Sequence, residues 1–424
     1  MSITQEKRTK TRALLVGSVA HGQDEEEALS LLEELVDLVG SLNIEVAESV
    51  LVRLRKTHAP FLLGKGKVDE IIALAQAHDC DLIVFDHELS PAQQRNWEKE
   101  SELVVIDRQE VILDIFAERA QTKEAVLQVE LAYWEYALPR LKRAWTHLSR
   151  QRGGSVTQRG EGEKQIELDQ RIVRQRIAKL KRELAEVVQH RGVQRKQRMK
   201  VPIPTASIIG YTNAGKSSLL QVLTKSDILV EDKLFATLDP VTRRLKLPSG
   251  RLLLLTDTVG FVRRLPHRLV DAFKATLEEA IHADFLIHVM DLSSPDVEQH
   301  RQTTLDVLAE LNISEKRIIP VFNKVDLQED ALFKSSLKAQ FPESIFVSVH
   351  TGEGLDVLQS TMDAVLEDSL ISAQLLIPYK EYEWVARLHQ MGCVCEEKDD
   401  EAGVWLKVHL PKRVYELLSP FVVQ

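Results

Sequence analysis

The sequence has few cysteines, few aromatic residues and no long apolar run. Its cysteines are Cys80, Cys393 and Cys395, too few for a disulfide framework, which favours a reducing compartment. Cys393 and Cys395 alternate in "GCVCEE" without the further ligands that a zinc site needs. The sequence contains no run of about 18 apolar residues, so it predicts no membrane span. The N-terminus, "MSITQEKRTKTR", lacks the apolar core of a signal peptide. We therefore expect a cytoplasmic protein that is not inserted in a membrane.

Charge is distributed unevenly along the chain. The formal net charge is −9. Residues 140–200 hold 18 Lys and Arg against 6 Asp and Glu, a net +12, so the rest carries −21. A basic block in an acidic protein indicates a surface for a polyanion. A solvated helical face explains the same charges equally well.

The first 120 residues alternate between short apolar runs and helical patterns. The runs "ALLVG", "DLIVFD" and "LVVID" are typical of buried strands, and "EEEALSLLEELVDLVGSL" has helical spacing. This alternation predicts an α/β layer with a mostly parallel sheet. The stretch "GKGK" at 64–67 lacks phosphate-loop spacing. We interpret it as a tight turn or basic loop, with nucleotide binding a weaker alternative.

Two heptad seams follow, and they predict an antiparallel helical hairpin. Pro139 interrupts the first seam and is expected to kink the helix. The joining segment "SRQRGGSVTQRGEGEKQ" is rich in glycine, so a mobile loop is expected. It carries Arg150, Arg152 and Arg159, which are candidates for RNA phosphates; a disordered connector is the alternative. The seam residues are Leu127, Leu131, Trp134, Leu138, Leu141, Trp145 and Leu148, then Val173, Ile177, Leu180, Leu184 and Val187.

The segment "SIIGYTNAGKSS" has the spacing of a phosphate-binding loop between a strand and a helix. Gly210 is followed after four residues by Gly215, Lys216 and Ser217. Glycines let backbone N–H groups converge on a phosphate, and the helix N-terminus adds a favourable dipole. Lys216 would neutralise the β- and γ-oxygens, and the Ser217 hydroxyl would bind Mg²⁺.

Four further motifs follow in the order that a guanine-nucleotide site requires. Thr237 is a second candidate Mg²⁺ ligand, and Asp257 ends an apolar strand and would hold the metal through water. The Gly260 N–H could sense the γ-phosphate. Asp326 in "NKVD" is suited to accept hydrogen bonds from guanine, a pairing that adenine cannot supply. In the same motif Asn323 would brace the loop and Lys324 would cover the base, while "SVHTGEG" at 348–354 would contact the guanine O6.

These patterns predict an α/β protein with four parts. Residues 1–122 form an N-terminal α/β domain, and 123–200 form an antiparallel helical hairpin with a mobile loop at about 149–164. Residues 201–370 form a P-loop GTPase domain with a mostly parallel sheet. Residues 371–424 form a small α+β domain without a functional signal.

The sequence resembles the HflX GTPases, of the Obg–HflX branch of translation-factor-like GTPases, over nearly its whole length. The most specific stretches are "GYTNAGKSSLL", "LFATLDPVTRR" and "DTVGFVRRLPHRLVDAFKATLEEA". The resemblance implies a cytoplasmic GTPase that binds the large (50S) ribosomal subunit and its rRNA. It also implies a role in splitting or rescuing stalled ribosomes under stress. DNA is not an expected partner, and a monomer is expected.

The resemblance also implies which residues contact GTP or GDP, with Ser217, Thr237 and Asp257 at Mg²⁺. Val349 stands where the family carries alanine, but a backbone contact should survive this change. The implied nucleotide contacts are Gly210, Tyr211, Thr212, Asn213, Ala214, Gly215, Lys216, Ser217, Ser218, Phe235, Ala236, Thr237, Leu238, Asp239, Asp257, Thr258, Val259, Gly260, Asn323, Lys324, Val325, Asp326, Ser348, Val349 and His350.

Phe261 stands where many nucleotide switches have the glutamine that positions the attacking water. Lys216, Thr237 and Gly260 therefore remain as the candidate catalytic residues. The resemblance implies slow intrinsic hydrolysis that the ribosome stimulates. Asn213 adds a second possibility. GTPases that lack the glutamine and carry asparagine at this position of the phosphate loop resemble those that bind K⁺ near the transferring phosphate, where the ion stabilises negative charge. The alternative is that Asn213 only braces the loop.

Two other functions fit the same residues. One is a GTP-gated RNA-binding module or ribosome-assembly factor in which hydrolysis only times release. The other is a GTPase that signals to an acidic protein or a lipid surface. Stimulation of hydrolysis by large subunits, and a steep salt dependence of binding, would distinguish them.

Overall fold

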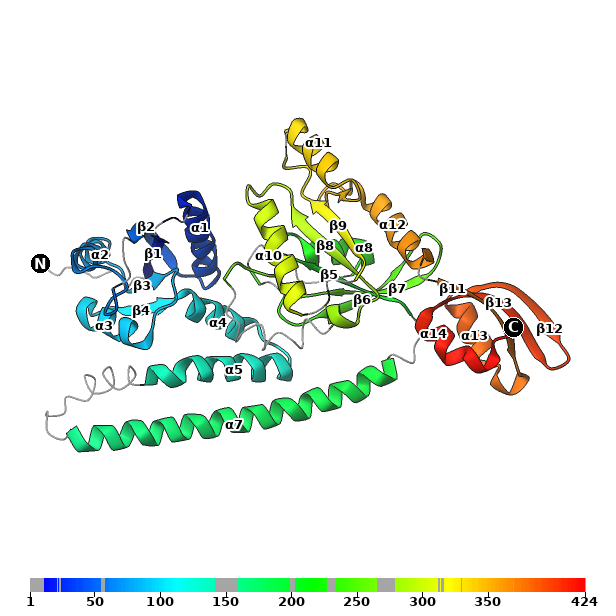
Figure 1. Ribbon diagram of the computed structural model, residues 1–424, viewed down its shortest axis with the longest axis horizontal. Helices are drawn as coiled ribbons and strands as arrows, with labels where there is room; N and C mark the ends of the chain where they lie inside the picture. Colours follow the sequence, from blue (N-terminus) through cyan, green and yellow to red (C-terminus); the bar gives the residue numbers. More distant parts are fainter. Residues whose placement is uncertain are drawn as a thin grey trace, which may run out of the picture. The chain divides into compact units, whose positions relative to one another are not determined.

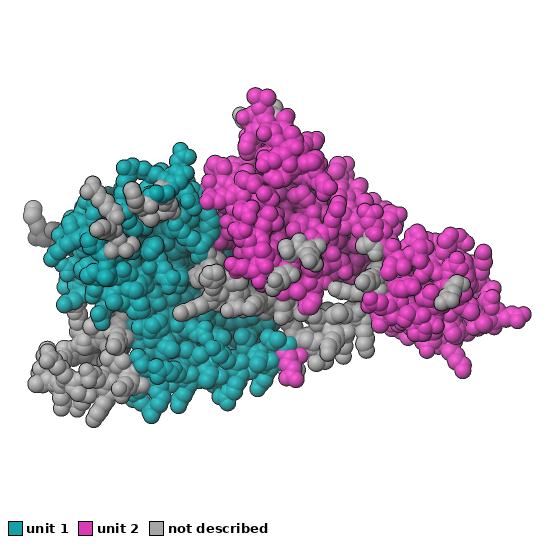
Figure 2. Space-filling model, in the orientation of Figure 1, with its two compact units in different colours: residues 1–188, 233–235, 263–273 teal, residues 189–232, 236–262, 274–424 magenta. Residues whose placement is uncertain are grey.

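The computed structural model describes residues 11–423, apart from 21, 23, 55–57, 142–158, 199–202, 227–233, 236, 265–278, 312, 314–315, 329 and 369. The chain forms two compact units (Figure 2). The first comprises 1–188, 233–235 and 263–273, and the second comprises 189–232, 236–262 and 274–424. Within the described segments, no helix is both long and apolar enough to cross a membrane.

The first unit contains a four-stranded sheet with strand order β2-β1-β3-β4 (Figure 1). All three strand pairings are parallel. The centre of β3 is buried on both faces, as its continuous apolar run predicts. The predicted α/β layer with a parallel sheet is therefore confirmed. Its elements are β1 (Arg12–Ala20), α1 (Glu25–Ser41), β2 (Glu45–Leu54), α2 (Lys65–Ala77), β3 (Leu82–Phe85), α3 (Pro91–Ser101), β4 (Val104–Asp107) and α4 (Arg108–Arg119).

The interpretation of "GKGK" as a tight turn or loop is wrong. Gly64 is the N-cap of α2 in an extended conformation, and Lys65 to Lys67 form the first helical turn. Val68, Ile71 and Ala75 are buried on one face of α2. Because this helical spacing begins at Val68, it favours a helix that starts within the "GKGK" stretch. Gly64 makes no side-chain cap, so only backbone groups define this helix end.

The predicted hairpin consists of α5 (Lys123–Ala137) and α7 (Arg159–Arg198), which lie side by side in Figure 1. Ion pairs Arg176–Glu130 and Lys181–Glu135 join them. A 3₁₀ turn, η1 (Leu138–Arg140), contains Pro139 and ends the first helix. In the seams, Leu127, Val173 and Leu180 are buried.

The predicted loop is too long at its C-terminal end, because α7 already begins at Arg159. Glu, Lys and Gln are good helix formers and outweigh the two glycines in this stretch. Arg150, Arg152, Trp145 and Leu148 lie outside the described residues, as does the side chain of Arg159.

The second unit contains a six-stranded sheet of order β10-β9-β8-β5-β7-β6, parallel except for β6. Alternate β8 residues face opposite sides. Ile287 packs in a core that includes α8 and α12, whereas Met290 packs in a core with α10 and α11. The elements are β5 (Thr205–Gly210), α8 (Lys216–Thr224), β6 (Val241–Lys246), β7 (Leu252–Asp257), β8 (Phe285–Asp291), α10 (Val297–Glu310), β9 (Ile318–Asn323), α11 (Ala331–Gln340), β10 (Ile345–Phe346) and α12 (Leu355–Asp368).

A small antiparallel sheet of order β11-β13-β12 ends the chain. The predicted hairpin is present as the pairing of β12 with β13, and two short helices pack on the sheet through one apolar core. Its elements are β11 (Leu370–Ile377), η2 (Tyr379–Glu381), α13 (Glu383–Gln390), β12 (Val394–Asp400), β13 (Gly403–Pro411), α14 (Lys412–Leu418) and η3 (Ser419–Phe421).

Candidate nucleotide site

The loop between β5 and α8 follows the central strand of the second sheet and turns at residues with positive φ. Gly210 has φ of +147°, and a Cβ there would lie 2.1 Å from the Val289 carbonyl oxygen. Gly215 has φ of +91° and would meet the Asn323 amide. Asn213 adopts a left-handed conformation with φ of +59° and is exposed. The loop therefore needs glycine at both ends and tolerates asparagine at its tip.

Lys216 is buried at the start of α8. Its Nζ donates to the Tyr211 carbonyl, 2.6 Å away, and so closes the loop on itself. Burial lowers the pKa of Lys216 to about 8, against the opposing effect of the Asp257 carboxylate. The ammonium thus sits in a desolvated site, where a phosphate would have little competition from water.

Three oxygen-bearing side chains converge beside Lys216. The Ser217 hydroxyl donates to Asp257 Oδ2 at 2.6 Å and lies 2.7 Å from the Thr237 hydroxyl. The Oδ1 atom of Asp257 is buried and has no hydrogen-bond partner. Burial raises the pKa of Asp257, whereas Lys216 and the Ser217 hydroxyl lower it. A buried carboxylate oxygen without a partner is suited to a cation or its bound water.

The loop after β7 is bound to the phosphate loop through its backbone. The Phe261 N–H donates to Gly210 O at 3.1 Å, and the Thr212 N–H donates to Phe261 O at 2.8 Å. A Cβ on Gly260 would lie 2.9 Å from Lys216 Nζ and 2.8 Å from Thr212 Cα, so only glycine permits this approach. The Phe261 side chain is 1% exposed. It is buried and has no group that could hydrogen-bond to an attacking water.

The "NKVD" motif lies at the end of β9, beside the loop after β10. The Asn323 amide donates to Ala214 O at 3.0 Å and accepts from the Val349 N–H at 3.2 Å. It thereby joins three of the predicted motifs. A hydrogen bond from Ser348 is the main cause that lowers the pKa of Asp326, so this carboxylate is ionised and ready to accept hydrogen bonds.

The remaining predicted residues lie around this centre. Lys324 has φ of +62°, and His350 is largely exposed with its Nδ1 3.9 Å from Asp326. The Thr258 hydroxyl donates to Ile208 O. Ala236 lies outside the described residues. Among the other predicted residues, Ser218 and Asp239 are half-buried, and those that are buried include Thr212, Ala214, Leu238, Val259 and Val325.

Two residues near the site were not predicted from the sequence. Asp291 ends β8 and pairs with Lys324 Nζ at 2.7 Å. Asp291 could have been predicted from its position, because it ends a strand that lies between β5 and β9, and both of these strands lead into predicted motifs. His300, in the first turn of α10, stacks on Tyr211 with ring centroids 3.7 Å apart. No local pattern connects these two residues.

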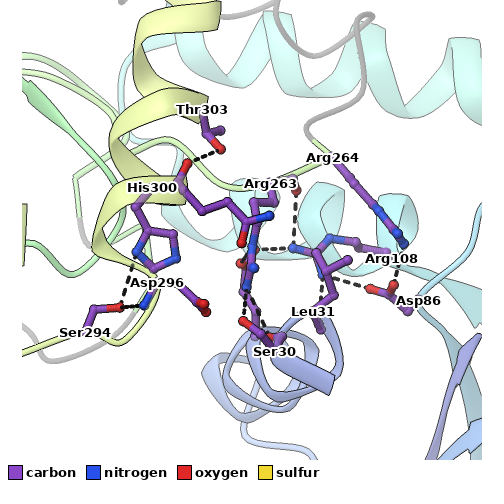
Figure 3. A network of polar contacts seen from close by, with 12 residues as sticks. Ser30, Leu31, Asp86, Arg108, Arg263, Arg264, Ser294, Asp296, His300 and Thr303 are labelled. Carbon is purple, nitrogen blue, oxygen red and sulfur yellow. Dashed lines mark hydrogen bonds and ion pairs between the residues drawn. The ribbon is translucent and has the colours of Figure 1, made fainter. Parts of the chain in front are cut away.

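In the first unit, residues from the two predicted switch segments make buried contacts. Phe235 packs edge-on against Phe116, with ring centroids 4.5 Å apart. Arg263 donates to Glu34 at 2.9 Å, and the Arg263 carbonyl accepts from Arg108 at 3.2 Å. Figure 3 shows the Arg108 guanidinium bonded to Asp86 as well.

Comparison with known proteins identifies the family. Three family models match in succession: GTP-binding GTPase N-terminal over residues 30–117, GTP-binding GTPase Middle Region over 119–198, and 50S ribosome-binding GTPase over 205–324. The GTPase HflX of Akkermansia muciniphila is 47% identical over 422 residues, which cover 97% of each chain. The chain belongs to the HflX family of GTPases.

A second HflX relative agrees with this assignment. The Escherichia coli GTPase HflX is 39% identical over 384 residues, covering 90% of this chain and 89% of the relative. A crystal structure of a GTP-binding protein from Sulfolobus solfataricus in complex with GDP is 26% identical and covers 84% of this chain and 98% of its own, with a TM-score of 0.44. The HflX relatives and the 50S ribosome-binding GTPase model together identify the chain as a GTPase with a link to ribosomes.

Proposed function

We propose that this HflX GTPase binds GTP with Mg²⁺ at the carboxyl edge of the second sheet, associates with the large ribosomal subunit and splits or rescues stalled ribosomes. The observation that carries the proposal is the convergence of the motif residues around Lys216, in a chain whose residues 205–324 match a 50S ribosome-binding GTPase family. Open α/β sheets bind ligands at this edge.

The side chains near Lys216 fit a magnesium ion. Ser217 and Thr237 would contribute hydroxyl oxygens, and Asp257 would hold the ion through water by its unpartnered Oδ1. When bound, Mg²⁺ would neutralise charge on the phosphate oxygens. Oxygen donors of this kind suit Mg²⁺ better than softer metals.

The protein's own groups then have separate roles. The N–H groups of the phosphate loop and Lys216 would hold the phosphates, the Gly260 N–H would meet the γ-phosphate, and Asp326 would select guanine. Since Phe261 is buried, this chain does not position water through that residue. We propose that intrinsic hydrolysis is slow and that the ribosome stimulates it. The lack of a water-positioning side chain at Phe261 supports this, because a partner can supply the missing stabilisation.

Asn213 offers one further means of stabilising charge. Its exposed, left-handed position at the tip of the loop allows the side chain to contribute to a K⁺ site near the transferring phosphate. We expect faster ribosome-stimulated hydrolysis in K⁺ than in Na⁺, and the replacement Asn213→Ala should remove the difference. Initial rates in KCl and NaCl at equal ionic strength measure this effect; equal rates in the unmodified protein would contradict it.

Ribosome association is tested by co-sedimentation with 50S subunits in GTP-analogue and GDP states, with and without residues 150–164. We expect stronger binding with the GTP analogue, and weaker binding without the segment. Binding should also weaken steeply with salt, since 18 Lys and Arg lie within 140–200. Equal binding in both nucleotide states would contradict the proposal. Nucleotide-dependent binding without stimulated hydrolysis would favour the alternative of an RNA-binding module in which hydrolysis only times release.

A further inference from the structure

The phosphate loop contains a buried tyrosine whose ring is held by a histidine from a distant helix. Tyr211 is 6% exposed. Its ring lies face to face with the His300 ring, with centroids 3.7 Å apart and an interplanar angle of 12°. Because stacked rings attract each other beyond their area burial, the His300 ring stabilises the observed position of the Tyr211 ring.

The His300 ring is itself held in place. The backbone N–H of His300, in the first turn of α10, donates to the Asp296 carbonyl oxygen at 2.9 Å. The ring Nδ1 is 3.5 Å from the Ser294 hydroxyl, which also accepts from the Asp296 N–H (Figure 3). The His300 carbonyl accepts from the fully buried Thr304 hydroxyl at 3.0 Å. Helix α10 thus presents the imidazole from a rigid support.

The backbone of Tyr211 connects two parts of the nucleotide site. Its carbonyl accepts from Lys216 Nζ at 2.6 Å. The residue also forms a parallel bridge with Phe261, whose N–H and carbonyl bond to the neighbours of Tyr211. A shift of Tyr211 would therefore move both the lysine and the loop that carries Gly260.

We propose that His300 is a positioning residue that acts through Tyr211 to hold the Gly260 loop where its N–H meets a γ-phosphate. The inference rests on the proposed function, since it presupposes that GTP occupies this site. It predicts an effect on GTP rather than on GDP. GDP has no γ-phosphate, so its affinity does not depend on the placement of Gly260.

Substitutions at His300 distinguish the effect of its ring stacking on Tyr211 from the effect of its contact with the Ser294 hydroxyl. His300→Ala and His300→Gln remove the flat ring, and the glutamine keeps a polar group. His300→Phe keeps the ring and removes the nitrogen. We expect the first two to lower the affinity for a non-hydrolysable GTP analogue, relative to GDP, by about two- to tenfold, the range for a stacked ring pair. We expect the phenylalanine variant to stay within about twofold of the unmodified protein.

The matched control is Arg301→Ala on the same helix. Arg301 lies 4.9 Å from the Phe341 ring centroid and pairs with Glu298, so it has a similar contact away from the phosphate loop. Fluorescent GDP and GTP-analogue titrations give the affinity ratio, and thermal unfolding reports on stability. The control should leave the ratio unchanged.

Three outcomes would count against the inference. A normal ratio in His300→Ala and His300→Gln, with or without reduced stability, would overturn it and assign the histidine a structural role. A phenylalanine variant as poor as the alanine variant would overturn the role of the stack. If His300→Ala does not fold, the glutamine and phenylalanine variants decide. Failure of the unmodified protein to bind either nucleotide would overturn the proposed function as well.

Discussion

Replacement of Lys216 by alanine is expected to lower kcat/KM for GTP hydrolysis by about 10²–10³-fold. Lys216 is the cation at the centre of the site, where burial lowers its pKa and the Asp257 carboxylate opposes that change. A preorganised positive charge in a desolvated site stabilises developing phosphate charge far more than it would in water. The loss should therefore exceed that of any exposed lysine.

The measurement is single-turnover hydrolysis of radiolabelled GTP with and without 50S subunits. Lys246→Ala is a suitable control, because Lys246 lies on the exposed edge strand β6 of the same unit. We expect the control to hydrolyse GTP at the unmodified rate, and both variants to unfold at similar temperatures. A Lys216→Ala variant that retains more than about a tenth of the ribosome-stimulated rate would show that another group carries this charge.

Much of the site could be predicted because its signals are local. The spacing from Gly210 to Ser217, between an apolar strand pattern and a helical pattern, is typical of a phosphate-binding loop. Few other backbone conformations fit that order of residues. Asp257 and Asn323 each end an apolar run. Strand ends in a parallel sheet gather at one edge, so the structure brings these residues together, as the motif order predicts.

The features that were missed depend on contacts between distant residues. The stack of His300 on Tyr211 joins a helix and a loop with no shared pattern. The sequence also shows that Phe261 lacks a hydrogen-bonding group, but not that its ring is buried. The early start of α7 at Arg159 has a different cause: Gly160 and Gly162 disfavour a helix locally, but the helix-forming Glu, Lys and Gln residues around them outweigh this preference.

The largest effect on stability is expected for substitution of Arg108. The distribution of charge along the sequence does not predict that this residue forms buried ion pairs. Arg108 is 2% exposed and pairs with Glu34 and with Asp86, the latter at 2.9 Å. The same two carboxylates also bind Arg263 and Arg264, at 2.9 and 2.6 Å. The ion-paired partners Arg263 and Glu34 are 229 residues apart in the sequence. Three guanidinium groups thus share two carboxylates in one cluster, which we call the Arg108 cluster. Figure 3 labels its three arginines and Asp86.

Replacement of Arg108 by alanine should destabilise the first unit by about 3–5 kcal/mol. The substitution removes the most buried cation of the Arg108 cluster and leaves the buried Glu34 and Asp86 carboxylates with fewer donors. It also leaves the Leu31 and Arg263 carbonyls without their Arg108 hydrogen bonds. The cost comes from charges and polar groups left uncompensated, and not from the net strength of the original pairs.

Hydrogen exchange is the appropriate measurement, because a chain with several compact parts does not unfold in a single two-state transition. Amides of α1 and α4 should lose protection in Arg108→Ala, since Glu34 lies on the first helix and Arg108 on the second. Arg176→Ala is the matched control: it breaks an ion pair with Glu130 whose side chains are 40% and 31% exposed, and it should cost at most about 1 kcal/mol. If the two variants lose protection equally, the Arg108 cluster does not stabilise this unit beyond an ordinary surface pair. A larger loss in Arg108→Ala, confined to the first unit, is the result that the buried charges predict.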